Sequence, residues 1–335
     1  MAPFDQAINI TKGVHKEGFQ VYVGDIDPEW VVGAIPNGGY VLALIVDACI
    51  QHQSKAQSGH VDPIHVTAHY LRTTAIARFE VFVRVLKSGR GFTNLTADLV
   101  QESQTKITTH LIFGINKPSS GSRTPINITP PSRYARRIPL YTHPSTAVIE
   151  PMRHTWGFHS QVNWTKEPEI LKRNRVDSVT RTDRNSIGGE GLEWGAWFEF
   201  VDKSARITNP SLAFLVDIFL NTPTLLPRSE RPGLTTSWFP TMTLAVEFKS
   251  PIPALSEKHA SRTVGLYSSG RFLNDPQGRH DMYVEVWTAP CNLGEGKEVD
   301  GWRDNQICLA VATQMALTIP IEVNQERGRK NTARL

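Results

Sequence analysis

The sequence predicts an α+β protein made of two similar halves, each with a buried helix followed by four antiparallel strands. Two stretches, 35–50 and 209–221, each contain a helix that is apolar on every side, so each helix must be surrounded by protein. Four strand-like runs follow each helix. The same order of elements in both halves indicates a divergent duplication, because the repeat is far longer than the roughly 20–50 residues of a solenoid.

In the first half, a short strand over 19–23 precedes the turn Pro36-Asn-Gly-Gly-Tyr40, which leads into the first buried helix. The runs that follow alternate apolar and polar residues or are rich in β-branched ones, with Gly, Asn or Ser between them. Because the runs are joined so closely, the strands should be antiparallel. We expect them over 64–71, 79–86, 92–101 and 106–115.

The second half repeats this order after a long segment rich in Ser, Gly and Pro, which predicts a linker over the surface. Its basic part, Arg133–Arg137, could serve an anionic ligand, but a solvated loop is the expected structure. Early strands are expected over 155–164 and 193–201, with a polar, Gly-rich insertion at 166–190 between them. Strands after the second helix are expected over 235–248, 261–269, 280–288 and 306–318, with an extra loop at 290–303.

These segments divide the chain into two domains. The N-terminal domain covers 1–117, a linker covers 118–152, the C-terminal domain covers 153–322, and a basic tail covers 323–335. The length of 335 residues is enough for two domains of ordinary size.

Composition indicates a soluble globular protein, with 40% hydrophobic and 20% charged residues and a net charge of +4. Lys and Arg are scattered along most of the chain, so we expect no nucleic-acid partner. We also expect no membrane span, because no apolar run is long enough to cross a bilayer.

Cys49, Cys291 and Cys308 match no metal or disulfide spacing, which fits a reducing compartment. We therefore expect neither a metal nor another cofactor, and the N-terminus lacks the form of a signal peptide.

Asp217 is the one charge inside the second apolar helix. An ionised carboxylate in such surroundings is costly unless it is hydrogen-bonded or paired. One interpretation is a structural Asp satisfied by nearby backbone or hydroxyl groups. The other is a carboxylate kept in a dry cleft for acid–base chemistry. The residue alone leaves both open.

Several short motifs, each weak by itself, occur in a specific order along both halves. The motifs are Pro36-Asn-Gly-Gly-Tyr40, Leu86-Lys-Ser-Gly-Arg90 with a strand ending in Gln101, Asp217, Pro240-Thr-Met-Thr-Leu-Ala-Val-Glu-Phe248 and Ala312-Thr-Gln314. With this order and spacing the chain resembles the type II acyl-CoA thioesterase family, in its fungal thioesterase-like branch. The resemblance covers nearly the whole chain and implies a double hot-dog fold, in which each of two curved antiparallel sheets wraps a buried helix.

The resemblance also implies hydrolysis of acyl-CoA thioesters by an Asp, a Ser or Thr, and a Gln from the second copy. These correspond to Asp217, Thr241 and Gln314. Asp217 would act as general base or orient the attacking water. The Thr241 hydroxyl and the Gln314 amide would fix that water, because both groups donate and accept hydrogen bonds.

In the family, the start of the first-copy helix points at the second-copy Asp. This makes Gly38, Gly39 and Tyr40 candidate substrate-binding residues, whose free N–H groups would hold the developing oxyanion. From the residues alone, a plain tight turn at Gly38-Gly39 is an equally good interpretation.

The corresponding set in the first copy is incomplete. It has Asp47, but Ile64 stands in place of the hydroxyl residue and His110 in place of the Gln. One complete and one degraded set is what a duplicated enzyme with one working site would show. The bacterial members carry an Asp where this chain has Thr243, a departure that bears on substrate range.

Two alternatives to an acyl-CoA thioesterase stay open. One is a thioesterase, dehydratase or cyclase for a polyketide or other carrier-bound intermediate of secondary metabolism, because the loops at 166–190 and 290–303 could reshape a pocket. The other is a non-catalytic acyl-binding protein. A serine hydrolase of the nucleophile-elbow type is not expected, because Gly-x-Ser-x-Gly is absent.

The chain ends in Ala333-Arg-Leu335, a permissible variant of the peroxisomal Ser-Lys-Leu address. We expect a peroxisomal or cytoplasmic protein of fatty acid metabolism. The resemblance also implies that association into a homo-oligomer is possible.

Overall fold

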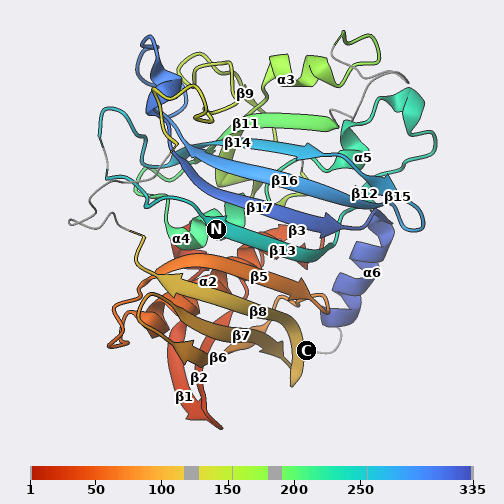
Figure 1. Ribbon diagram of the computed structural model, residues 1–335. Helices are drawn as coiled ribbons and strands as arrows, with labels where there is room; N and C mark the ends of the chain where they lie inside the picture. The colour runs from red at the N-terminus through yellow and green to blue at the C-terminus, as the bar shows by residue number, and fades with distance from the viewer. Residues whose placement is uncertain (1, 117–127, 153, 180–190, 255, 333–335) are drawn as a thin grey trace.

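A computed structural model describes residues 2–116, 128–152, 154–179, 191–254 and 256–332. Its dominant feature is one antiparallel sheet of 14 strands, to which both halves of the chain contribute (Figure 1). The first half supplies β1 (Thr11–Lys16), β2 (Phe19–Asp25), β5 (Asp62–Tyr70), β6 (Arg78–Ser88), β7 (Thr93–Gln101) and β8 (Gln104–Gly114). The second supplies β9 (Ile149–Glu150), β10 (Val162–Thr165), β11 (Leu192–Phe200), β13 (Thr241–Phe248), β14 (Thr263–Gly270), β15 (Leu273–Asn274), β16 (Arg279–Thr288) and β17 (Cys308–Ala316).

The remaining elements are short apart from two helices. Two small antiparallel pairs join β3 (Val31–Val32) to β4 (Ile35–Pro36) and β12 (Ser237–Trp238) to β18 (Ile319–Pro320). The helices are α1 (Phe4–Ala7), α2 (Gly38–Gln53), α3 (Pro168–Arg173), α4 (Asn209–Leu215), α5 (Thr222–Leu225) and α6 (Ile321–Thr332). Three single turns of 3₁₀ helix are η1 (Gly157–Ser160), η2 (Arg228–Glu230) and η3 (Trp302–Asn305). None of the described helices combines the length and the apolar character that a membrane span needs.

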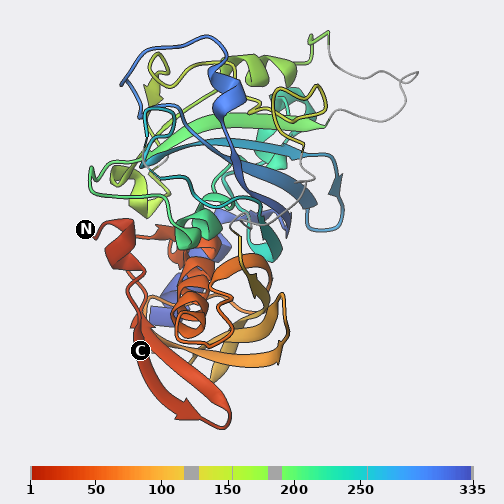
Figure 2. The same cartoon turned by 60° about the vertical axis from the view of Figure 1, so that its left-hand side comes forward.

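The strand order repeats in the two halves. In the first half it is β2-β6-β7-β8-β5, and in the second it is β11-β14-β16-β17-β13. The two orders meet where β5 pairs antiparallel with β13, with Val66 opposite Val246. Figure 2 shows the N-terminal half, in red to orange, and the C-terminal half, in green to blue, lying end to end. The predicted α+β duplication is therefore what the chain forms.

The core lies on one face of this sheet and encloses α2 and α4, which pack against each other. Side chains on β7 alternate between buried and half-buried, as expected when one face of a sheet covers a core. Both helices are buried on nearly all sides, and Leu42 and Phe214 have no exposed surface. Because the same core cluster spans both halves, neither half can be separated without exposing apolar surface.

The second buried helix is shorter than predicted, because α4 ends at Leu215. The amides of Asp217 and Ile218 donate to carbonyl oxygens three residues back, at 3.0 and 3.1 Å, where a continuing α-helix would bond four back. The prediction that Asp217 lies within the helix is therefore wrong. It lies in the turn after α4, from which its carboxylate reaches a different element.

The segment before the second half differs from the predicted surface linker. Of its described residues, Ile138 and Leu140 are buried in a second cluster, on the face of the sheet opposite the helices. The basic segment is held by ion pairs, since Arg136 bonds the buried Glu285 and Arg137 bonds Asp304. The strand predicted over 155–164 is mostly the turn η1, and only its last residues enter β10.

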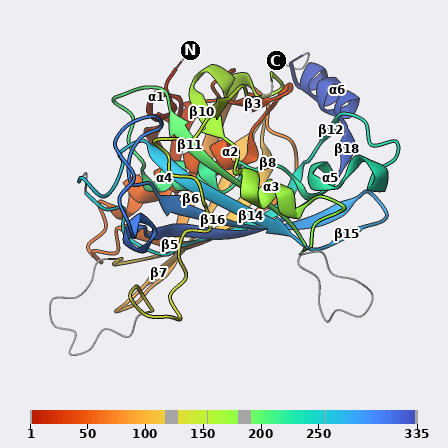
Figure 3. The ribbon, with the colours of Figure 1, turned by 90° about the horizontal axis from the view of Figure 1, so that it is seen from above.

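The described part of the predicted basic tail, 323–332, belongs to a helix. α6 begins at Ile321, so the predicted domain boundary at 322 falls inside it. It contacts β4 of the first half and β12 and β18 of the second. Seen from above, α6 lies beside β12 and β18 and apart from α2 (Figure 3). The final tripeptide, 333–335, lies outside the described residues.

Candidate active site

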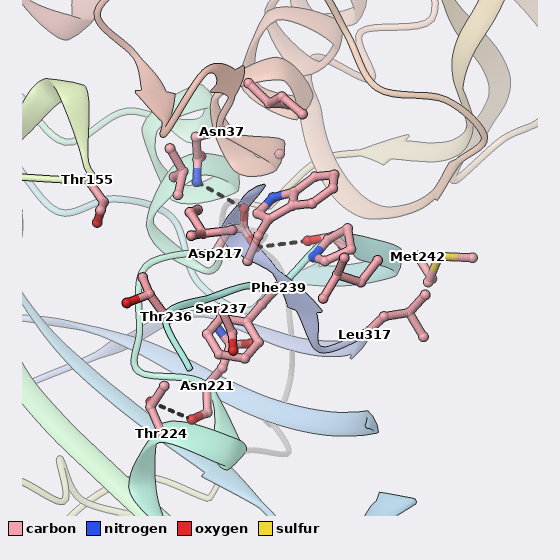
Figure 4. A pocket seen from close by; sticks show the side chains of 18 of the residues that line it. Asn37, Thr155, Asp217, Asn221, Thr224, Thr236, Ser237, Phe239, Met242 and Leu317 are labelled. Carbon is pink, nitrogen blue, oxygen red and sulfur yellow. Dashed lines mark hydrogen bonds between the residues drawn. The ribbon is translucent and has the colours of Figure 1, made fainter. Parts of the chain in front are cut away.

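A pocket of about 1180 Å³ lies where the two halves meet. Its walls come from the start of α2, the end of β5, the segment after α4, the stretch before β13, and α6. Figure 4 shows Asp217 beside Asn37 in this pocket, with Phe239, Met242 and Leu317 among the apolar side chains around it. Polar and apolar groups line the pocket in similar measure. A concave site of this size is typical of small-molecule binding.

Asp217 is the centre of the polar groups and is held by four hydrogen bonds. Its Oδ2 accepts from the Gly39 N–H at 2.8 Å and from Asn37 Nδ2 at 3.2 Å. Its Oδ1 accepts from Gln314 Nε2 and, at a longer 3.4 Å, from the Thr241 hydroxyl. The donors come from both halves of the chain, so the site exists only when the halves are packed together.

The surrounding protein changes the acidity of Asp217. Its side chain is partly accessible, because it lines the pocket, but the atoms packed around it desolvate the carboxylate. Burial raises the pKa of Asp217 to about 6, against the lowering effect of its hydrogen bonds to Gly39, Gln314, Thr241 and Asn37. A carboxyl group with a pKa near neutrality can take up and release a proton at ordinary pH.

Thr241 and Gln314 are brought together by the pairing of β13 with β17. A register shift between Thr241 and Thr243 marks an irregularity at the start of β13, where strands often redirect a side chain next to a site. Gln314 Nε2 donates to the Thr241 hydroxyl at 2.9 Å as well as to Asp217. The three residues predicted as catalytic therefore form one connected cluster. Gln314 Oε1 accepts no hydrogen bond from any residue that the structure describes.

Of the predicted substrate-binding residues, Gly38 lies in the pocket wall. Its carbonyl accepts from the Tyr70 hydroxyl at 2.9 Å. The Gly39 and Tyr40 amides are already engaged, by Asp217 and by the Asn37 side chain respectively. Among the described residues, the Gly38 N–H has no acceptor, which makes it the free donor at the start of α2.

Tyr40 is not at the pocket, so its prediction as a substrate-binding residue needs correction. Its ring is fully buried, and its hydroxyl donates to the Ala7 carbonyl at 2.8 Å and accepts from the Asp27 N–H at 3.0 Å. Since successive helix side chains point in directions about 100° apart, a residue two positions after Gly38 faces a different neighbour. Tyr40 fixes α2 against the N-terminal segment.

Comparison with known protein families gives two matches along the chain. Residues 26–114 match the acyl-CoA thioesterase N-terminal domain, and residues 144–291 match the acyl-CoA thioesterase C-terminal domain. Together the two models cover more than two thirds of the sequence. This chain belongs to the acyl-CoA thioesterase family. It is a thioester hydrolase that acts on acyl-CoA.

Solved structures of similar proteins show the fold of this thioesterase. One, from Thermobifida fusca and assigned as a thioesterase II, has 20% identity and a TM-score of 0.65, with 95% of this chain and 98% of that chain covered. Another, the acyl-CoA thioesterase II TesB2 of Mycobacterium marinum, has 13% identity and a TM-score of 0.61, covering 95% and 98%. A hot-dog protein from Alicyclobacillus acidocaldarius has 16% identity and a TM-score of 0.60, covering 94% and 97%. The predicted double hot-dog fold is confirmed. A comparison with curated protein sequences gives no significant match.

Sequence analysis did not identify two residues that build the candidate site. Asn37 caps α2 by accepting from the Tyr40 N–H, and its Nδ2 binds Asp217. Tyr70 is at the end of β5 and bonds Gly38. The Pro-Asn-Gly-Gly turn was a usable signal for Asn37, since Asn is a preferred N-cap. No local pattern indicates Tyr70, because its role depends on the end of β5 lying beside the start of α2.

The first-copy set does not assemble into a second site. Asp47 Oδ2 accepts from Gln51, one turn along its own helix, at 2.9 Å. His110 is exposed and lies opposite Thr67 and Thr96, whereas the neighbouring Leu111 is buried. The predicted correspondence of His110 with Gln314 is therefore wrong by one residue, because a shift of one position in a strand places a side chain on the opposite face.

Two further predictions about the pocket concern Thr243 and the loops. Thr243 is half-buried and does not line the pocket. None of the described residues of 166–190 or 290–303 lines the pocket either. Within the second loop, Leu293 and Trp302 pack on the opposite face of the sheet. The described parts of these loops therefore cannot reshape the pocket as predicted.

Proposed function

We propose that Asp217, Thr241 and Gln314 bind and activate the water that hydrolyses the acyl-CoA thioester. The observation that supports this proposal is the connected cluster in the pocket wall, centred on a carboxyl group whose pKa is raised to about 6. The water oxygen attacks the thioester carbonyl carbon while one of its protons passes to Asp217. The C–S bond then breaks, and Asp217 returns the proton to the CoA thiolate as it leaves.

The hydrogen bonds indicate where the water enters. A carboxylate has about four lone-pair sites, and the four donors around Asp217 occupy them. The Thr241 contact is the longest at 3.4 Å, so it is the one that a water can replace with least loss. Such a water would donate to Asp217 and to Gln314 Oε1 and accept from Thr241. This arrangement leaves an oxygen lone pair for the carbonyl carbon.

The Gly38 N–H is the proposed donor to the developing oxyanion. It belongs to the first turn of α2, where free amides and the helix dipole favour negative charge. Removing one preorganised oxyanion donor typically costs about 10²–10³ in kcat. The Tyr70 hydroxyl supports this donor by fixing the carbonyl of the same residue at 2.9 Å.

Replacing Asp217 tests the proposal. We expect Asp217→Asn to fold normally and to lose about 10²–10⁴ of kcat, because the amide cannot accept the proton. Thiol release from short, medium and long acyl-CoAs measures the loss, and circular dichroism checks the fold. Asp47→Asn is the matched control, a partly buried helical Asp outside the pocket, and should retain activity. Undiminished hydrolysis by Asp217→Asn would contradict the proposed role of Asp217 as the base.

The acyl group is proposed to be a fatty acyl chain, because apolar side chains such as Phe219, Trp238 and Met242 line the pocket. The C-terminal Ala333-Arg-Leu335 supports a peroxisomal location, and a fluorescent fusion with and without this tripeptide would test it.

Association into a homo-oligomer stays a prediction from the resemblance. Sedimentation analysis would check it.

A further inference from the structure

The charge around the pocket is one-sided. Four arginines line it, and Asp217 is the only Asp or Glu among the lining residues. The arginines are Arg72, Arg228, Arg231 and Arg327. They come from the segment just after β5, from the η2 turn and the residue after it, and from α6, so three separate parts of the chain contribute positive charge to one opening.

These arginines are not used for ion pairs within the described part of the chain. Arg72 donates to the Thr105 carbonyl, and Arg327 lies over the Trp238 ring at 5.7 Å. Arg231 has a buried Nε with no hydrogen-bond partner. Leaving a buried donor without an acceptor costs free energy, so the unpaired Nε of Arg231 indicates that an acceptor binds there. Other arginines, such as Arg262 and Arg136, are paired with carboxylates.

The acidic neighbours of these arginines face elsewhere. Glu230 in the η2 turn and Glu326 on α6 are exposed and do not line the pocket. The positive charge is therefore not cancelled inside the opening. Several unpaired guanidinium groups around a concave site favour polyanions, and Arg in particular fits phosphate oxygens in a bidentate manner.

One of the four arginines depends on a segment outside the matched thioesterase domains. Arg327 is on α6, whereas the second domain match ends at residue 291. Asn324 docks this helix. It is fully buried, accepts from the Ala34 N–H at 2.9 Å and donates to the Val32 carbonyl at 3.0 Å. The helix is thus fixed with Ile321 and Arg327 in the pocket wall.

We propose that Arg72, Arg228, Arg231 and Arg327 form the site that binds the phosphate groups of CoA, with Arg327 delivered by the C-terminal helix. This inference rests on the proposed function, because the acyl thioester must lie at Asp217 while the phosphates lie at the arginines. The site distinguishes acyl carriers by charge. CoA carries a diphosphate and a 3′-phosphate, whereas a protein-bound phosphopantetheine carries a single phosphodiester.

Binding of adenosine 3′,5′-bisphosphate, measured by calorimetry, tests the site without any turnover. Each of Arg231→Gln and Arg327→Gln should weaken binding about tenfold, and the double variant should weaken it further. Arg329→Gln is the matched control, because Arg329 is on the same helix but does not line the pocket. Unchanged binding by the double variant, or equal weakening by Arg329→Gln, would overturn the proposal.

Kinetics give the second measurement. For acyl-CoA, the Arg231 and Arg327 variants should raise KM about tenfold with little change in kcat, and the wild-type KM should rise with salt. Hydrolysis of an acyl-N-acetylcysteamine thioester, which has no phosphate, should be the same in variant and wild type. Equal effects on both substrates would contradict phosphate recognition. Undiminished acyl-CoA hydrolysis by Asp217→Asn would instead reject the proposed roles of Asp217, Thr241 and Gln314, and would leave the binding result to stand by itself.

Discussion

At the scale of the residue, the proposed chemistry depends on how Asp217 is surrounded. Burial destabilises the ionised carboxylate, and hydrogen bonds from four donors partly offset this effect. The balance leaves a group that is ionised at neutral pH but still basic enough to accept a proton. An exposed Asp, with a pKa near 3.9, would be a weaker base, since base strength falls with pKa.

The proposed role of Asp217 as the base leads to a prediction about the pH dependence of the reaction. A carboxyl group with its pKa raised to about 6 is protonated below that pH and cannot act as a base. We expect kcat to fall about tenfold per pH unit below 6 and to level off above 7. Rates between pH 4.5 and 8.5 with one acyl-CoA measure it. A profile that stays flat down to pH 4.5 would contradict Asp217 as the base.

At the scale of the element, the site depends on the close approach of α2 to the turn after α4. A Cβ on Gly39 would lie 2.6 Å from the Asp217 Cβ and 2.8 Å from the Phe214 carbonyl oxygen. Real Cβ atoms do not approach this closely, so the helix start can reach the carboxylate only because residue 39 is a glycine. The interpretation of this turn as a site element, and not only a tight turn, is consistent with that contact.

Gly39→Ala tests this packing. The added methyl must push α2 away from Asp217, which we expect to lower the free energy of unfolding by about 1–3 kcal/mol and to reduce kcat more than tenfold. Urea unfolding and thiol release measure the two effects. Gly91→Ala is the control, because a Cβ there meets nothing within 4 Å and its φ is not positive. If Gly39→Ala matched this control in both measurements, the close approach would not matter.

At the scale of the whole molecule, the C-terminal helix ties the end of the chain to the segment that leads into α2. Gly33 has a φ of +65°, and a Cβ there would lie 2.4 Å from Asn324 Oδ1. Both the backbone conformation and the contact require glycine at this position. In Figure 1, α6 descends from the second half toward the first. It contacts elements of both halves, and its residues Ile321 and Arg327 line the pocket.

Asn324→Ala should therefore affect both stability and catalysis. Loss of its two hydrogen bonds leaves the Ala34 N–H and the Val32 carbonyl without their partner, which we expect to cost about 1–3 kcal/mol. The KM for acyl-CoA should also rise, because Arg327 moves with the helix. Thermal unfolding and steady-state kinetics measure these changes, with exposed Gln325→Ala as control. A variant indistinguishable from Gln325→Ala would show that the docking contributes nothing.

The sequence by itself determined the order of the main elements and the two buried helices, and through resemblance it indicated the cluster of Asp217, Thr241 and Gln314. The helices and strands follow from local patterns, because the spacing of apolar residues within a short window distinguishes a helix from a strand. Only the tertiary structure decided that α4 ends before Asp217, that Tyr40 faces the core, that His110 faces outward, and that α6 docks through Asn324. The reason is distance along the chain. The bond between Gly39 and Asp217 spans 178 residues and that between Asn324 and Val32 spans 292, and no local pattern records which distant segments meet.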